Sequence, residues 1–223
     1  MIKKIKEMIT PKVSTEQQDI PLEKDQRIIM LDPSVLGLDV EADESAEPDL
    51  RILGLFADVH EEKVAELIHG LLVLDEVNKL SKEDIRKPIE FYISTYGGNA
   101  DDMFGLYDII RQVKETSEIH TIGLGKVMSA GVLLLASGTQ GKRKIGKNCR
   151  VMIHSVMGGN HGSLHNMMNE LEAIEQLQDM YCDALIECTK LTRAKLKKMI
   201  ERKVNVYLSA EEAVEMGIAD III

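Results

Sequence analysis

The sequence contains no tryptophan, only three cysteines and no long apolar run. None of the cysteines stands in a Cys-x-x-Cys pair, so neither a disulfide framework nor a zinc cage is indicated, and we expect reduced thiols in a cytoplasmic compartment. The most apolar run, 132–136, is far too short to cross a bilayer, and the first residues lack the apolar stretch of a signal peptide. We therefore expect a soluble protein with no membrane partner.

Positive charge is scarce as well: 37 acidic residues face 27 lysines and arginines, which gives a formal net charge of −10. This balance argues against a nucleic-acid partner, because binding a phosphate backbone depends on basic side chains that displace its counterions. A chain of 223 residues is long enough to bury a substantial core in one domain. With three phenylalanines and twelve methionines, that core must be mainly aliphatic.

Residues 1–50 differ in character from the rest of the chain. They hold four of the five prolines, and between residues 39 and 49 there are six acidic residues and no basic one. This composition is typical of a solvated loop or mobile arm, and a segment that docks a partner is the alternative. Within it, 25–31 has the composition of a short strand.

From residue 51 onward, strand patterns alternate with helical ones. The strands are expected at 51–56, 88–94, 119–125, 143–145 and 149–153, and the helices at 61–78, 101–116, 129–137, 164–191, 193–203 and 210–217. Ser209 and Glu212 form the sequence pattern of a capping box at the start of the last helix. This alternation predicts right-handed crossovers and an α/β fold with a mainly parallel sheet.

Two loops at strand ends carry residues suited to chemistry, because ligands of such sheets bind beyond the carboxyl ends of the strands. At Gly97 and Gly98 the missing Cβ atoms leave backbone N–H groups free to face a ligand oxygen, although a glycine pair is also common in a plain tight turn. Ser129 begins a helix, where the helix field favours a developing oxyanion, although serine at this position is more often just a cap. Lys126 beside it is a minor alternative as a base.

A nucleophilic serine needs a base within hydrogen-bond reach, and histidine is the usual one. Among the six histidines, His154 stands out because it follows the apolar strand 151–153, again at a strand end. His161 and His165 are four residues apart and could share a helix face as metal ligands, but no third ligand is evident and we expect no metal site.

The residues 51–220 together resemble the proteolytic subunit of the Clp protease. The resemblance is carried by Gly97-Gly98, the GLGKVMSAGVLLLASG block around Ser129, GKRKIGKNCRVMIH ending at His154, the glycines of 158–162 and the closing LSAEEAVEMGIAD. It implies a crotonase-like α/β fold of repeated β-β-α units over 51–223. A protruding handle, made of a strand and a long helix at about 158–191, is also implied, and residues 1–50 become a divergent N-terminal arm.

The same resemblance implies an assembly and a set of partners. The family forms homo-oligomers of two stacked heptameric rings, which degrade polypeptides delivered by an AAA+ unfoldase. That partner uses the ATP, so no cofactor is expected on this chain. The handle helix fits such an assembly, because a symmetric partner would cover apolar side chains that one projecting helix would leave in water. These side chains include Leu164, Met167, Met168, Leu171, Ile174, Leu177 and Leu185.

Site roles also follow from the resemblance. Ser129 matches the nucleophile and His154 the general base, while the backbone N–H groups of Gly98 and Ala130 match the oxyanion hole. Gly97 and the segment after the base, Ser155, Val156 and Met157, match positions that bind the substrate peptide.

Several positions depart from the family pattern. The third triad residue is an aspartate in the family, but the matching position is Asn205, which can accept a hydrogen bond from the base without supplying charge. Glu201 or Glu212 could substitute for it. Tyr96 and Asn99 replace the family's proline and serine around the glycine pair, and Ser155–Met157 replaces Gln-Pro-Leu, so the cleavage preference is open.

Three interpretations follow. The first is a serine endopeptidase of the Clp type with reduced or conditional activity. The second is a weak or inactive structural subunit of a mixed ring, because the charge of the third triad residue is missing. The third is another crotonase-fold enzyme that uses the same oxyanion hole for acyl transfer.

Overall fold

The computed structural model describes residues 50–159, 161–201 and 205–223. These residues belong to one compact unit that spans Asp49–Ile223. The expected N-terminal arm and its strand at 25–31 lie outside the described residues, apart from Leu50 at the arm's end.

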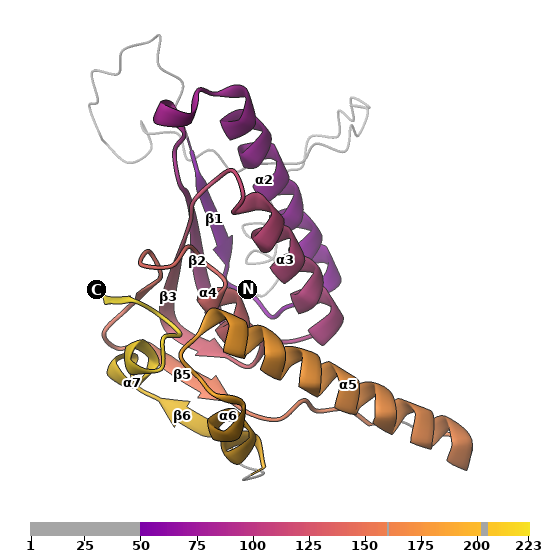
Figure 1. The fold of residues 1–223 in the computed structure, drawn as a ribbon. Helices are drawn as coiled ribbons and strands as arrows, with labels where there is room; N and C mark the ends of the chain where they lie inside the picture. The colour runs from indigo at the N-terminus through magenta and orange to yellow at the C-terminus, as the bar shows by residue number, and fades with distance from the viewer. Residues whose placement is uncertain (1–49, 160, 202–204) are drawn as a thin grey trace, which may run out of the picture. The chain divides into compact units, whose positions relative to one another are not determined.

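Strands and helices alternate through this unit, as the sequence predicts (Figure 1). The strands are β1 (Ile52–Leu55), β2 (Ile89–Thr95), β3 (Ile119–Met128), β4 (Lys144–Ile145), β5 (Arg150–Ile153), β6 (Val206–Leu208) and β7 (Ile221–Ile222). The helices are α2 (Glu61–Leu80), α3 (Ala100–Val113), α4 (Ala130–Ala136), α5 (Leu164–Cys188), α6 (Arg193–Ile200), α7 (Ala210–Glu215) and the 3-10 turn η2 (Glu83–Ile85). The predicted capping box is present, because Ser209 Oγ accepts from the Glu212 N–H while Glu212 Oε2 accepts from the Ser209 N–H.

All described strands join one sheet, in the order β1-β2-β3-β4-β7, with β5 paired to the end of β3 and β6 paired to β5. Every pairing is parallel except the antiparallel one between β5 and β6. The α/β class with a mainly parallel sheet is therefore confirmed. Helices α2 and α3 pack side by side against one face of this sheet (Figure 1).

Strand β3 is longer than the sequence predicts, because it runs past Gly125 to Met128. Gly125 has a φ of 63°, and the register with β2 shifts between Ile93 and Thr95. The glycine therefore forms a bulge that bends the strand instead of ending it. Before the bulge β3 pairs with β4, and after it with β5, so the bend carries the end of β3 to the strand that precedes His154.

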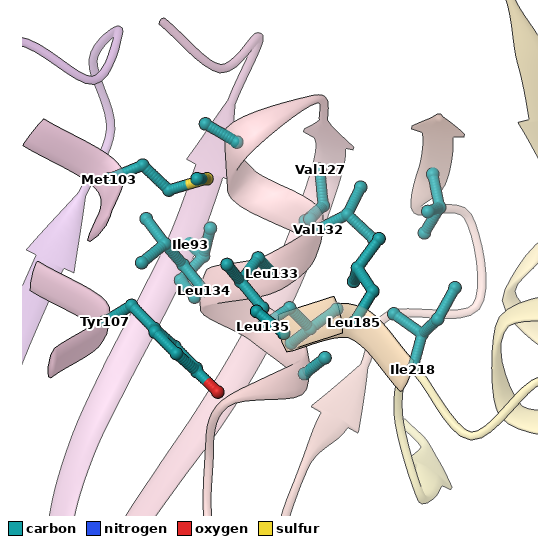
Figure 2. Close-up of a cluster of buried hydrophobic side chains, with 14 of the residues drawn as sticks. Ile93, Met103, Tyr107, Val127, Val132, Leu133, Leu134, Leu135, Leu185 and Ile218 are labelled. Atoms are coloured by element: carbon teal, nitrogen blue, oxygen red, sulfur yellow. The ribbon is translucent and has the colours of Figure 1, made fainter. Parts of the chain in front are cut away.

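Helix α4 lies in the centre of the core, and all seven of its residues are buried. Its leucines, Leu133, Leu134 and Leu135, lie among side chains of β2, β3, α3 and α5 (Figure 2). Burying one such side chain contributes about 1.5–3 kcal/mol, so the position of this short helix is strongly determined by packing. The first turn of α4, which follows Ser129, is thereby fixed relative to the sheet.

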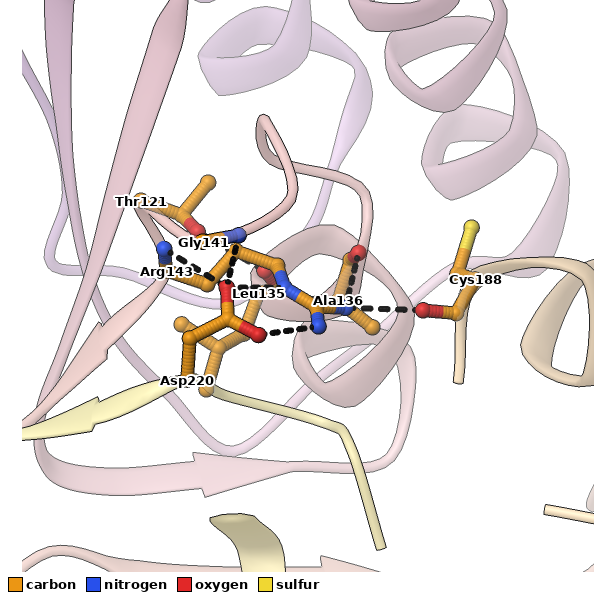
Figure 3. A network of polar contacts seen from close by, with 7 residues as sticks. All are labelled: Thr121, Leu135, Ala136, Gly141, Arg143, Cys188 and Asp220. Carbon is orange, nitrogen blue, oxygen red and sulfur yellow. Dashed lines mark hydrogen bonds and ion pairs between the residues drawn. The ribbon is translucent and has the colours of Figure 1, made fainter. Parts of the chain in front are cut away.

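A buried arginine ties the end of the chain to this core (Figure 3). Arg143 donates from Nε and Nη2 to the carboxylate of Asp220, and from Nη1 to the carbonyl oxygens of Ala136 and Cys188. It thus joins the C-terminal ends of α4 and α5 to β7. Burial acts to raise the pKa of Asp220, but the bonds from Arg143 outweigh this effect and hold the pKa below its ordinary value.

The handle, residues 158–191, differs in part from the expectation. Its helix is present as α5, but no strand forms in the described residues of 154–163. A strand needs a neighbour to accept its hydrogen bonds, and this segment, which holds Gly158, Gly159 and Gly162, has none in the described chain. His161 precedes α5, so it shares no helix face with His165, contrary to the metal-ligand alternative.

Among the helices of the described ranges, none is both long and apolar enough to span a bilayer. The first half of α5 nevertheless exposes apolar side chains: Leu164 is 70%, Met168 60% and Leu171 58% exposed. Ile174 and Leu177 are half-buried and Leu185 is buried, so the apolar side chains of α5 divide between an exposed tip and a packed base.

Candidate active site

Ser129 lies between the end of β3 and the start of α4, in a backbone conformation that side chains rarely adopt. Its φ is 53° and its ψ is −122°, and no other non-glycine residue in the described part of the chain has a positive φ. A sharp turn of this kind between strand and helix exposes a serine hydroxyl at the strand end, at a cost of about 1–3 kcal/mol. The Ser129 side chain makes no hydrogen bond to the backbone N–H groups at the start of α4. Ser129 therefore does not act as a side-chain cap of this helix, which was the alternative to a chemical role.

The glycine pair packs directly against this turn. The Val59 N–H donates to Gly97 O at 2.7 Å and the Asn99 N–H donates to Val59 O at 2.9 Å. The Gly97 carbonyl and the Asn99 N–H, which flank Gly98, both face Val59. In an extended chain successive backbone groups alternate in direction, so the N–H of Gly98 points away from Val59. A Cβ on Gly97 would lie 2.6 Å from Ser129 Cβ, and one on Gly98 would lie 2.2 Å from Val59 O, so both positions require glycine.

Ala130 supplies a second backbone donor beside this loop. As the first residue of α4, its N–H has no preceding helical turn to accept it. The Cβ of a residue at position 97 would lie 3.1 Å from this nitrogen, which shows how close the glycine loop comes to it. The N–H groups of Gly98 and Ala130 are thus both available next to Ser129, as an oxyanion hole requires.

His154 follows β5, whose last residue is Ile153. Strand β6 pairs with β5 so that Ile153 lies opposite Val206 and Met152 opposite Tyr207. Continuing this antiparallel register by one residue sets Asn205 opposite His154, where side chains on one face lie about 5 Å apart at Cβ. In the described part of the chain, no hydrogen bond joins His154 to Ser129 Oγ or to Asn205.

A cavity of about 370 Å³ brings most of the predicted site residues together. The predicted residues among its walls are Gly98, Ser129, Ala130, His154, Ser155, Val156 and Met157. Gly97 and Asn205 are not among them: Gly97 packs against Ser129, and Asn205 is an exposed residue just before β6.

The sequence did not predict the opposite wall of the cavity. Met103 from α3 and Ile174, Leu177 and Tyr181 from α5 make it largely apolar, and Asp101 is the one carboxylate among the lining residues. Their positions in ordinary helical patterns gave no signal for a role at the site.

The three alternative groups, Lys126, Glu201 and Glu212, have other contacts. The ammonium of Lys126 lies 4.7 Å from the centre of the Tyr96 ring, in a cation–π contact. The carboxylate of Glu212 accepts the Ser209 N–H in the capping box, and Glu201 lies within ion-pair distance of Lys197. In the described ranges, no group of three or more histidine, cysteine, aspartate or glutamate side chains is placed to hold a metal ion.

Comparison with known proteins agrees with the resemblance that the motifs carry. A family model described as Clp protease matches residues 48–223. The chain is 36% identical over 174 residues to the ATP-dependent Clp protease proteolytic subunit 3 of Synechococcus sp. (strain CC9902), covering 78% of this chain and 82% of that protein. It is 33% identical over 173 residues to the ATP-dependent Clp protease proteolytic subunit 1 of Prochlorococcus marinus (strain MIT 9312), covering 78% and 84%.

Proposed function

Because the chain belongs to the Clp protease family, we propose that it is a serine endopeptidase, the proteolytic subunit of a self-compartmentalised protease, with Ser129 as nucleophile and His154 as general base. The observation that carries the proposal is that Ser129, in a strained conformation and without a cap hydrogen bond from its side chain, lines one cavity together with His154, Gly98 and Ala130. The expected substrates are unfolded polypeptides.

The proposed reaction proceeds in two halves. Ser129 Oγ attacks the scissile carbonyl carbon while His154 takes the hydroxyl proton, and the N–H groups of Gly98 and Ala130 stabilise the oxyanion. His154 then protonates the leaving amine, which leaves an acyl-enzyme on Ser129. Water attacks this ester with His154 again as base, the bond between the acyl carbon and Ser129 Oγ breaks as His154 returns the proton to Oγ, and the carboxylic acid product is released.

The walls of the cavity bear on the cleavage preference. Met103, Ile174 and Leu177 favour an apolar substrate side chain, because the burial of apolar surface drives binding. Asp101 at the start of α3 adds a negative charge, and no lysine or arginine lines the cavity. Peptides that pair an apolar residue with a basic one are therefore the preferred substrates in this proposal.

The proposed assembly is two stacked heptameric rings of this chain, served by an AAA+ unfoldase that uses ATP. The exposed apolar side chains at the tip of α5 support it, since such a patch is costly in water and a second copy would cover it. Three free cysteines fit a reducing cytoplasm. Native mass spectrometry tests the assembly, and a stable monomer would refute it.

Asn205 favours a second candidate function. Without a carboxylate opposite His154 the imidazolium loses an important stabiliser, and the chain could serve as a weak or inactive structural subunit of a mixed ring. A fluorophosphonate probe separates the two. Ser163, whose side chain caps α5 and does not line the cavity, provides the control. Labelling of the wild type and of Ser163→Ala, but not of Ser129→Ala, supports the peptidase, whereas a wild type that takes up no label supports the structural subunit.

A further inference from the structure

We propose that Tyr181 is a positioning residue of the oxyanion hole, acting on the peptide group between Ser129 and Ala130. This inference rests on the proposed function. Tyr181 lies on α5, is 5% exposed and lines the cavity. Its hydroxyl donates a hydrogen bond of 3.0 Å to the carbonyl oxygen of Ser129.

That carbonyl belongs to the same planar unit as the N–H of Ala130. In a trans peptide the C=O and the N–H point in opposite directions, so fixing the direction of one fixes the other. The bond from Tyr181 therefore aims the Ala130 N–H away from Tyr181. A hydrogen bond accepted by the carbonyl also polarises the peptide and makes its N–H a stronger donor.

The strain at Ser129 explains why such support is needed. A residue in a sparsely populated conformation keeps it only when its surroundings hold it. The Ser129 N–H donates to Met152 O at 2.8 Å, and its carbonyl also accepts the Val132 N–H at 3.0 Å within the first turn of α4. Tyr181 adds a contact from another element, the long helix α5.

The phenol remains a donor throughout the working pH range. Burial raises the pKa of Tyr181 far above its ordinary value, so the hydroxyl keeps its proton at any pH at which a histidine base is active. The contribution of Tyr181 is therefore constant with pH.

Tyr181→Phe removes the hydroxyl and keeps the ring that packs in the cavity wall. Tyr107→Phe is the matched control, because its buried phenol bonds Glu187 and Cys188 away from the cavity. Removing a direct oxyanion donor costs roughly 100- to 1,000-fold in kcat, so losing a group that only orients a donor should cost about tenfold. We expect this loss in kcat for Tyr181→Phe with little change in KM, and none for Tyr107→Phe.

A peptide aldehyde forms a tetrahedral adduct with Ser129, and its affinity can be measured. If Tyr181 only stabilised the fold, Tyr181→Phe would leave this affinity unchanged. The affinity of the aldehyde should fall in Tyr181→Phe by the same factor as kcat/KM, because both depend on the oxyanion. A labelled, active Tyr181→Phe variant with unchanged kcat and aldehyde affinity would overturn the role of Tyr181 alone. A wild type that neither turns over peptide nor labels at Ser129 would overturn the proposed function and this inference with it.

Discussion

Under the proposed function, Asn205→Asp should give His154, the proposed base, a carboxylate partner in place of an amide. The register of β5 and β6 ends with Ile153 opposite Val206, and its continuation by one residue would set residue 205 opposite His154 and bring the new carboxylate near the ring. Two unit charges about 4 Å apart interact by about 4 kcal/mol at an effective dielectric constant of 20. Because Asn205 is exposed and His154 half-buried, water screens much of this and leaves about 1–2 kcal/mol.

This energy corresponds to a gain of roughly 5- to 30-fold in kcat/KM, measured with a fluorogenic peptide across pH. A nearby carboxylate favours the imidazolium, so the acid limb of the pH–rate profile should also move to higher pH. Asn148→Asp is the matched control, because it adds the same charge at an exposed loop residue that does not line the cavity. If Asn205→Asp changes neither the rate nor the acid limb, another group supports His154 and the register argument is wrong.

Three further substitutions test other parts of the structure. Gly98→Ala should abolish peptidase activity, because its Cβ would lie 2.2 Å from Val59 O and displace the donor loop; retained turnover would relocate the oxyanion hole. The preference tested by Asp101→Asn is kcat/KM for a lysine-containing peptide divided by kcat/KM for the matching norleucine peptide. This preference should fall about two- to fivefold, as expected for the loss of an exposed charge, and an unchanged preference would exclude Asp101 from substrate selection. Asp220→Asn should cost about 3 kcal/mol of unfolding free energy at pH 7 in urea titrations, because it leaves Arg143 buried without its partner. Because the pKa of Asp220 is lowered in the folded protein, this stabilisation is present above about pH 4 and is lost as the pH falls further. On acidification the unfolding free energy of the variant should therefore fall less than that of the wild type, and an equal fall in both proteins would contradict this.

The long, periodic elements of this fold could be predicted from the sequence, because their side-chain patterns reflect burial directly. The short strands could not: β6 has three residues and β7 two, and such segments form only because a neighbouring strand already offers its edge. The end of β3 was misplaced for a related reason. Gly125 reads as a strand terminator in isolation, whereas in the sheet it forms a bulge between two partners.

For the candidate site, strand ends and family motifs together pointed to Ser129, His154, Gly98 and Ala130, and the structure sets these residues around one cavity. Their roles stay predictions until activity is measured. The placement of Asn205 depends on β6, and so it could be predicted from the resemblance but not from the local pattern.

Tyr181 shows most clearly what a one-dimensional pattern leaves out. Its place in a long helix predicts only that it packs, which it does, with 5% of its surface exposed. The feature that matters is the direction of one hydroxyl relative to a peptide group 52 residues away in the chain. A strained serine needs contacts from several elements at once, here from the glycine loop, from β5 and from α5, and such convergence exists only in the folded chain. Contacts that reach a strained turn through its backbone are therefore not visible in the pattern of any single element.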